Sequence, residues 1–207
     1  VDGRIVVAGT EGNAFRVARF DDTGALDSTF DGDGIITRIF PGSGNDSARH
    51  IAVQQPDGKL VVVGSTAGTS LGAVDDLALA RYNLDGSLDP TFGNGGQVIT
   101  DFGESEVARA VAIQADGKLV VAGQSSGKFI VVRYNPDGSL DTSFGTGGRV
   151  TTFYSVAGGD GATSVAIQPD GKIVAAGAVT ISGNLDFGVF RFNADGSTDT
   201  SFNGTGK

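Results

Sequence analysis

The sequence predicts an all-β protein, a β-propeller-type array of about four four-stranded antiparallel repeats that is a partial propeller or is incomplete at both ends. Three observations predict it. A twelve-residue motif recurs without gaps, short apolar runs alternate with Asp-Gly turns, and helical periodicity appears nowhere. The four copies of the motif are residues 19–30, 81–92, 133–144 and 191–202. We therefore expect a single repeat domain, 1–207, with repeats at 1–47, 48–107, 108–161 and 162–207.

The first half of each repeat is predicted to be a hairpin. A short apolar strand precedes an Asp-Gly turn, and a continuous apolar run follows it, as a strand covered on both faces requires. In Pro56-Asp57-Gly58, Pro presets φ and Gly takes the left-handed position, which closes a tight turn. The first strands are expected at 50–54, 110–114 and 164–168, and the second at 4–9, 59–64, 118–123 and 172–177.

The second half of each repeat contains the twelve-residue motif. A third strand runs into the motif, the motif turns, and a fourth strand follows. The third strands are expected at 15–20, 77–82, 129–134 and 187–192, and the fourth at 35–40, 97–102 and 148–153. A β-solenoid is the alternative, although its coils are usually shorter and its hairpin turns fewer. Because the first and fourth strands occur in fewer copies, we expect adjacent repeats or another copy of the chain to complete the strand edges.

These motifs carry a resemblance to a known family. The run Asp-Gly-Lys-Leu-Val-Val-Ala-Gly at 116–123 and the longer run at 133–148 resemble the bacterial delta-60 repeat family, over nearly the whole chain. Residues 21–25 depart from the pattern, with Asp-Asp-Thr-Gly-Ala in place of Asn-Pro-Asp-Gly-Ser. The resemblance implies a large secreted or surface-attached bacterial protein with propeller-like repeats, and hence an extracellular or cell-surface location.

Composition excludes several classes of function. Fifteen Lys and Arg against 24 Asp and Glu give a net charge of −9, which repels phosphate backbones and anionic lipid. We therefore expect no nucleic-acid partner. No apolar run approaches the roughly 18 residues of a membrane span, so no membrane insertion is expected. The absence of Cys excludes disulfides and Cys-based metal sites, and we expect no cofactor.

The connections between strands vary in length at one end of the predicted sheets and are nearly constant at the other. Insertions in repeat proteins gather on one face, which is often the binding face. Neutral drift of surface loops explains the variation equally well. The variable segments are residues 41–49, 66–76, 103–109, 154–163 and 180–186.

The motif pairs an Arg with an Asp eight residues later in every copy. Arg133 shares its side of the strand with apolar residues, and an Arg on an apolar face needs a partner. We interpret Asp141 as that partner and the pair as a structural pin, with a ligand site as the alternative. The four predicted structural pairs are Arg19 with Asp27, Arg81 with Asp89, Arg133 with Asp141 and Arg191 with Asp199.

Residues 123–127 fit the pattern of a nucleophile elbow, Gly-x-Ser-x-Gly. That elbow needs a strand, a turn and a helix, together with a His partner. Here the pattern leads into another strand, and His50 is the sole His of the sequence. We therefore expect no catalysis from it.

Metal binding is not expected, and the weak candidate is a calcium site at Asp31 and Asp33. Their carboxylates are closely spaced, but the segment lacks the Glu that ends an EF-hand loop. The other repeats have Gly and Asn or Thr there, which is typical of a turn. His50 has no second His or Cys to share a metal.

The sequence thus favours a non-catalytic extracellular binding or adhesion module, not an enzyme, whose variable loop face binds protein or carbohydrate. The alternative is a structural spacer in a long surface protein or fibre. A propeller hydrolase or lyase is less favoured, because a single His is available; its residues would be His50 and Asp46.

Overall fold

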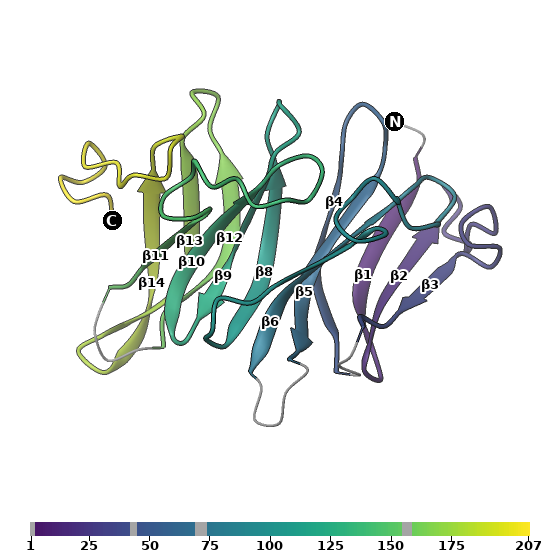
Figure 1. The fold of residues 1–207 in the computed structure, drawn as a ribbon, viewed down its shortest axis with the longest axis horizontal. Helices are drawn as coiled ribbons and strands as arrows, with labels where there is room; N and C mark the ends of the chain where they lie inside the picture. The colour runs from purple at the N-terminus through teal and green to yellow at the C-terminus, as the bar shows by residue number, and fades with distance from the viewer. Residues whose placement is uncertain (1–2, 42–44, 69–73, 155–158) are drawn as a thin grey trace. The chain divides into compact units, whose positions relative to one another are not determined.

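The computed structural model describes residues 3–41, 45–68, 74–154 and 159–207. These residues form four antiparallel sheets (Figure 1) in which the strands follow chain order, so the predicted all-β class is confirmed. The described part of the chain contains no membrane-spanning helix. Sheet 1 contains β1 (Ile5–Glu11), β2 (Ala14–Phe20) and β3 (Ile35–Arg38), and sheet 2 contains β4 (Ser47–Val53), β5 (Leu60–Ala67), β6 (Asp75–Tyr82) and β7 (Gln97–Thr100). Sheet 3 contains β8 (Glu106–Ile113), β9 (Leu119–Ser125), β10 (Lys128–Tyr134) and β11 (Arg149–Thr152), and sheet 4 contains β12 (Gly161–Ile167), β13 (Ile173–Ile181) and β14 (Asn184–Phe192).

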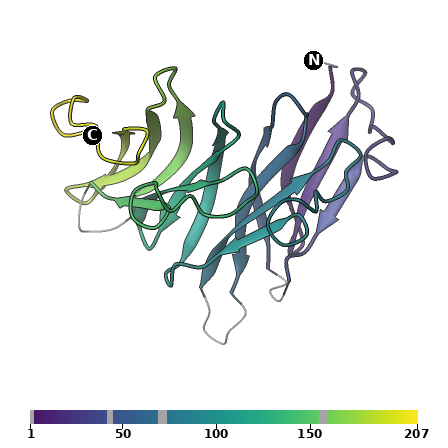
Figure 2. The same ribbon diagram turned by 45° about the horizontal axis from the view of Figure 1, so that its top comes forward.

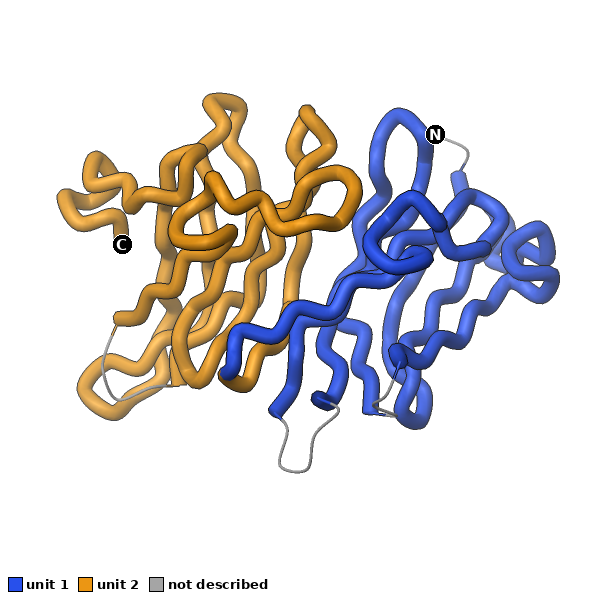
Figure 3. The backbone as a smooth tube through the Cα atoms, in the orientation of Figure 1, with its two compact units in different colours: residues 1–103 blue, residues 104–207 orange. Residues whose placement is uncertain are grey.

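The chain divides into two compact units, Val1–Gly103 and Glu104–Lys207 (Figure 3). Unit 1 holds sheets 1 and 2, and unit 2 holds sheets 3 and 4. A second view shows the strands of each sheet running side by side as a meander (Figure 2). Within each unit the two sheets pack against each other through apolar side chains, around Phe15 and Val62 in unit 1 and around Phe129 and Phe190 in unit 2. Burial of these faces is the main source of stability.

The first strands of the repeats begin earlier than predicted and contain a β-bulge. In sheet 3 the pairing with β9 shifts between Ala108 and Ala110, so the apolar alternation that the sequence shows breaks at this point. The bulge brings the carbonyl oxygen of Val107 against Gly123, where a Cβ would lie 1.9 Å from it. Glycine is therefore required at the end of the predicted second strand. Sheets 2 and 4 repeat the arrangement with Gly64 against Ser47 and Gly177 against Gly161.

The variable segments lie, within each unit, at the end of the strands where second strands end and third strands begin. We call this the loop end. Residues 180–186, expected as a loop, are mostly strand, because β13 and β14 extend until Ser182 and Gly183 reverse the chain at φ of 50° and 83°. Positive φ at two central residues suits a two-residue hairpin. Parts of three other predicted segments, 42–44, 69–73 and 155–158, lie outside the described residues.

Candidate functional site

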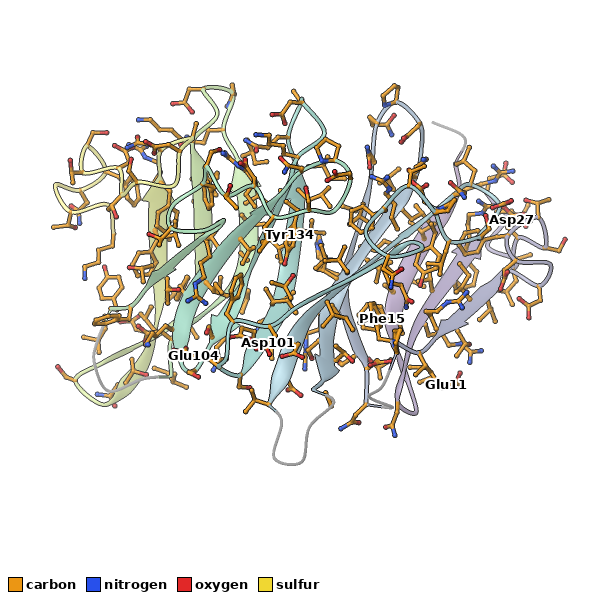
Figure 4. All side chains as sticks on the ribbon, in the orientation of Figure 1. Glu11, Phe15, Asp27, Asp101, Glu104 and Tyr134 are labelled. Atoms are coloured by element: carbon orange, nitrogen blue, oxygen red, sulfur yellow. The ribbon has the colours of Figure 1, made fainter. Side chains whose placement is uncertain are left out.

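The predicted pair in the third repeat lies at hydrogen-bonding distance. Arg133, on β10, has its Nε 2.7 Å from Asp141 Oδ2, and both side chains are buried. The same oxygen is 2.8 Å from the ammonium of Lys118, at the start of the second strand. The other oxygen accepts hydrogen bonds from Ser143, through its backbone N–H and its hydroxyl. The other three pairs have the same geometry, at 2.8 Å for Arg19 and Asp27, 2.7 Å for Arg81 and Asp89, and 2.6 Å for Arg191 and Asp199 (Asp27 is labelled in Figure 4).

The guanidinium of this Arg also contacts an aromatic ring and the next repeat. The Cζ of Arg133 lies 4.6 Å from the ring centroid of Phe144, a cation–π arrangement. Its Nη1 donates to the carbonyl oxygen of Ala194, in the turn that follows β14 of the same unit. In unit 1, Arg19 donates in the same way to Leu84. The guanidinium of Arg133 therefore contacts the carboxylate of Asp141, the ring of Phe144 and the carbonyl of Ala194. That these contacts stabilise the fold stays a prediction.

The carboxylates of the network are held ionised. Burial acts to raise the pKa of Asp141, but hydrogen bonds from Lys118, Ser143 and Arg133 outweigh it and hold the pKa well below its usual range. The pKa of Asp89 is lowered against burial in the same way, by hydrogen bonds from Lys59 and Thr91 together with the charge of Arg81. These carboxylates therefore act as charged hydrogen-bond acceptors for the cations and hydroxyls around them.

The second cation of each network was not predicted from the sequence. Lys59, Lys118 and Lys172 contact the motif Asp, and Arg4 does so in the first repeat. The signal for it was present, because a Lys or Arg directly follows the Asp-Gly turn that precedes the second strand of every repeat. Sequence spacing alone does not show that this residue reaches an Asp more than twenty positions later.

Two buried Asp residues fasten segments at the loop end. In unit 2, Asp160 Oδ2 accepts a hydrogen bond from the N–H of Tyr154 at 2.6 Å, and Oδ1 accepts one from the N–H of Thr180 at 2.8 Å. In unit 1, Asp46 likewise accepts from the N–H of Phe40 and from the hydroxyl of Thr66. Asp46, one of the hydrolase residues considered from the sequence, therefore serves to join strands.

His50, the other such residue, lies exposed on β4 opposite Val63. Asp31 and Asp33, the calcium candidates, lie in the turn before β3. The carboxylate of Asp33 accepts a hydrogen bond from the N–H of Ile35, and the N–H of Asp31 donates to the carbonyl of Asp85. Both residues therefore take part in turn and inter-sheet hydrogen bonds.

A carboxylate, hydroxyl and ammonium group come together at the loop end of unit 2. Glu104 lies just before β8, and its Oε2 accepts a hydrogen bond of 2.9 Å from the hydroxyl of Ser125, the last residue of β9 (Glu104 is labelled in Figure 4). Its other oxygen lies 3.9 Å from the ammonium of Lys128, the first residue of β10. The hairpin turn at Ser126 and Gly127 places Ser125 and Lys128 at neighbouring strand ends.

Glu106 supports this arrangement from a buried position next to Ser125. Its side chain is fully buried, and its Oε1 accepts a hydrogen bond of 3.2 Å from the N–H of Glu104 and lies 3.3 Å from the Ser125 hydroxyl. The side chains of Glu104 and Lys128, in contrast, are 42% and 40% exposed. An exposed carboxylate and cation therefore sit on a buried, hydrogen-bonded base. Ser125 is the Ser of the Gly-x-Ser-x-Gly pattern; it is followed by a strand, as expected, and its hydroxyl hydrogen-bonds to a carboxylate.

Two further carboxylates meet at the loop end of unit 1, on β6 and just after β7. The pKa of Asp76 is raised by burial and then by the negative charges of Asp101 and Asp75. Asp76 and Asp101 could share a cation, because their carboxylate oxygens lie within 4.8 Å of each other and hard cations prefer such oxygens.

Comparison with protein families gives one match. The model of a beta-propeller domain of unknown function, DUF5122, matches four segments that together make up more than half of the chain. The matched segments are residues 2–30, 55–92, 114–144 and 168–202. They contain all four copies of the Arg-to-Phe motif, so the match bears out a propeller-type repeat family.

Comparison with solved structures gives a likeness to one described as a putative gluconolactonase. The sequences are 14% identical, the TM-score is 0.44, and the likeness covers 93% of this chain and 76% of the other. Comparison with curated proteins gives no match.

The non-catalytic binding or adhesion function expected from the sequence is corrected by this finding, and so is the expectation that the chain is not an enzyme. The solved structure carries the name of an enzyme. A single His does not exclude an enzyme, because Glu and Lys also perform acid–base and electrostatic roles. A likeness this distant identifies no acting residue, so the chemistry must be argued from this chain.

Proposed function

Since the chain belongs to the DUF5122 beta-propeller family, whose function is unknown, we propose a function from its own residues: hydrolysis of an ester or lactone, with Glu104 as general base. One observation carries the proposal. The exposed carboxylate of Glu104 is oriented by Ser125, at 2.9 Å, and has the ammonium of Lys128 on its other side, at 3.9 Å.

This pair of groups supports acyl hydrolysis better than glycoside hydrolysis. Glycoside hydrolysis usually needs two carboxyl groups on opposite sides of the scissile bond. Glu106 is fully buried, so it cannot touch a substrate, and Glu104 is the accessible member. One base and one cation meet the needs of water attack on a carbonyl, where negative charge develops on oxygen.

The reaction divides into two steps. In the first, the Glu104 carboxylate takes a proton from a water molecule as the water oxygen bonds to the carbonyl carbon. The carbonyl electron pair moves to oxygen, and the ammonium of Lys128 stabilises this alkoxide. In the second, the carbonyl forms again, the bond to the ester oxygen breaks, and the leaving oxygen takes the proton from Glu104. An ester yields an acid and an alcohol, and a lactone yields a hydroxy acid.

Ser125 and Glu106 act as positioning residues. The Ser125 hydroxyl donates to Glu104, and the buried Glu106 carboxylate holds the backbone N–H of Glu104. Fixing a base in this way lowers the reorganisation needed during reaction. Loss of Ser125 should therefore reduce the rate less than loss of the Glu104 carboxylate.

The test is hydrolysis of a panel of nitrophenyl esters of short acids and of five- and six-membered aliphatic lactones. Wild-type protein is compared with Glu104→Gln, which removes the base and keeps the shape of the side chain. Glu11→Gln is the matched control, because Glu11 is an exposed loop-end Glu on β1, paired with Arg16. We expect Glu104→Gln to lose about 10²–10⁴-fold in kcat, the usual contribution of a general base, while the control keeps its rate. Turnover of no member of the panel, or equal rates for both variants, contradicts the proposal.

Two finer assignments are proposed from sequence features. We propose that the repeats are of the delta-60 type, because residues 133–148 carry its full motif. We also propose a location outside the cell, which the same resemblance supports. Fractionation of cells that express the gene tests the location, and finding the protein wholly inside the cell contradicts it.

A further inference from the structure

Each sheet has two faces, which we name by direction along the chain. The leading face contains the motif Arg and the residues two and four positions before it, which are Phe129, Val131 and Arg133 in sheet 3. In sheets 1 and 3 this face packs against the second sheet of the same unit. The trailing face is the opposite one, and in sheets 2 and 4 it packs against the first sheet of the same unit. In sheet 4 it contains Phe190 and Phe192, with their strand partners Ala175 and Ile173.

The same face-to-face contact occurs inside both units. In unit 2, Phe129 of the leading face lies 4.7 Å from Phe190 of the trailing face, measured between ring centroids, and both are buried. In unit 1, Phe15 and Val17 of sheet 1 share one buried cluster with Val62 of sheet 2. The repeat therefore builds a complementary pair of faces.

The leading face of sheet 4 and the trailing face of sheet 1 carry exposed apolar side chains. On the leading face of sheet 4, Phe187 is 82% exposed and Leu185 is 77% exposed, whereas Phe129 and Phe15, which hold the position of Phe187, are fully buried. A hollow of about 530 Å³ lies over this face, beside Ala176, Phe187 and Val189. Large exposed apolar patches of this kind mark interaction sites.

On the trailing face of sheet 1, Ile5 is 57% and Val7 is 46% exposed. Their counterparts by strand register in sheet 4, Ile173 and Ala175, are fully buried. A second hollow, of about 430 Å³, lies over this face beside Val7 and Ala18.

We propose that the leading face of sheet 4 binds the trailing face of sheet 1 of a second copy of this chain, head to tail. The occupant is a second copy because the chain itself carries both halves of a contact that each unit forms internally. Different patches meet in such an interface, so it is heterologous. Association goes beyond the proposed hydrolysis and does not depend on it.

The polar contacts of the internal interfaces identify those of the proposed one. Internally, the motif Arg donates to a carbonyl three residues after the next motif Arg, as from Arg133 to Ala194. The N–H of the residue after the motif Phe donates to the carbonyl of the residue four positions after the next motif Arg, as from Gly145 to Asp195 at 2.8 Å. In the proposed interface, Arg191 donates to the carbonyl of Asp22, and the N–H of Asn203 donates to the carbonyl of Thr23.

The state of these groups fits the proposal. The side chain of Arg191 is 20% exposed, against 8% for Arg133, whose neighbouring sheet is in place. Asn203 and Thr23 are exposed. The trailing face of sheet 1 also carries Arg16, whose charge is compensated by Glu11, so it does not bring an unpaired cation into the interface.

Sedimentation velocity of the full chain over a wide range of concentration provides the test. Wild-type protein is expected to associate, whereas Phe187→Glu and Val7→Glu each sediment as monomers. Val74→Glu is the matched control, since Val74 is an exposed apolar residue of the β5–β6 connection, and it should associate as wild type does. Far-ultraviolet circular dichroism establishes that each variant is folded.

Mixing the two monomeric variants distinguishes head-to-tail pairing from other modes. Phe187→Glu keeps its trailing face and Val7→Glu keeps its leading face, so an equimolar mixture should give a dimer and nothing larger. A wild-type chain that stays monomeric, a mixture that stays monomeric, or a Val7→Glu variant that still self-associates overturns the proposal.

Discussion

Arg133 Nε lies 2.7 Å from Asp141 Oδ2, and the same relationship recurs in all four repeats at a spacing of eight residues. The Asp-Gly turn between the partners reverses the chain and brings them together. Phe144 covers the guanidinium, and Lys118 adds a second positive charge to the same carboxylate. Phe144 and Lys118 therefore form one connected network with the Arg133–Asp141 pair.

Removing one partner of this pair should destabilise the protein. Arg133→Ala leaves the buried Asp141 without its guanidinium, which typically costs about 3–5 kcal/mol in the free energy of unfolding. The double variant, Arg133→Ala with Asp141→Ala, should cost less than the two single changes added together. Urea denaturation of the four proteins measures the coupling. Single variants that are neutral and strictly additive would show that the pair does not stabilise the fold.

The lowered pKa of these carboxylates predicts a pH dependence of stability. In the unfolded chain the pKa of an Asp is about 3.9, whereas the pKa values of Asp89 and Asp141 are lower in the folded protein. The unfolded state then binds more protons, so the contribution is fully present above the unfolded pKa and is lost as pH falls through the folded pKa.

Lys118→Met should reduce this contribution, because it removes a hydrogen bond that lowers the pKa of Asp141. Acid unfolding of the variant, followed by circular dichroism, should have its midpoint at a higher pH than that of wild type. Lys128→Met is the control, since Lys128 contacts Glu104 outside the network. Equal midpoints for wild type and Lys118→Met would contradict the assignment.

Glycine is predicted to be required where the bulge of a first strand meets the second strand. A Cβ at Gly123 would lie 1.9 Å from the carbonyl oxygen of Val107, so Gly123→Ala should cost about 1–3 kcal/mol through overpacking. Gly9 holds the corresponding place on β1 and has nothing within 4 Å of such a Cβ. Gly9→Ala should therefore leave the melting temperature unchanged or raise it slightly. Equal effects of the two substitutions would refute the bulge argument.

The buried carboxylate of Asp160 is predicted to hold the loop end of unit 2 together. Asp160→Asn keeps one acceptor and loses the other, so either Tyr154 or Thr180 loses the partner of its N–H. We expect a loss of about 1–3 kcal/mol in the free energy of unfolding, measured by denaturation. Asp186→Asn is the control at an exposed position of β14. If neither substitution changes the free energy of unfolding, Asp160 does not hold the loop end together.

The strands were predictable from the sequence because they depend on local signals. Apolar runs, the Asp-Gly turns and the fixed motif act over a few residues. The bulge at Arg109 was not predicted, because a bulge depends on the neighbouring strand. Lys118 was missed for a related reason: it reaches Asp141 across the sheet, and sequence spacing does not reveal that contact.

The candidate site was beyond the reach of sequence patterns. Glu104 and Ser125 lie 21 residues apart and meet because two strand ends are neighbours. The Gly-x-Ser-x-Gly pattern includes Ser125, but a nucleophile elbow pairs its Ser with a His, whereas Ser125 donates to the carboxylate of Glu104. Turn residues such as Asp33 were correctly recognised as turn-forming, because their hydrogen bonds are local.

Chemical rescue tests the central claim, that the Glu104 carboxylate is the general base, most directly. Glu104→Ala removes the carboxylate and leaves space beside Ser125 and Lys128 that a small carboxylate can enter. The measurement is the rate of ester hydrolysis by Glu104→Ala and by wild type with increasing formate. The account predicts that formate raises the rate of the variant to saturation and leaves wild type unchanged. A variant as fast as wild type without formate, or an equal response of both proteins to it, would contradict the claim.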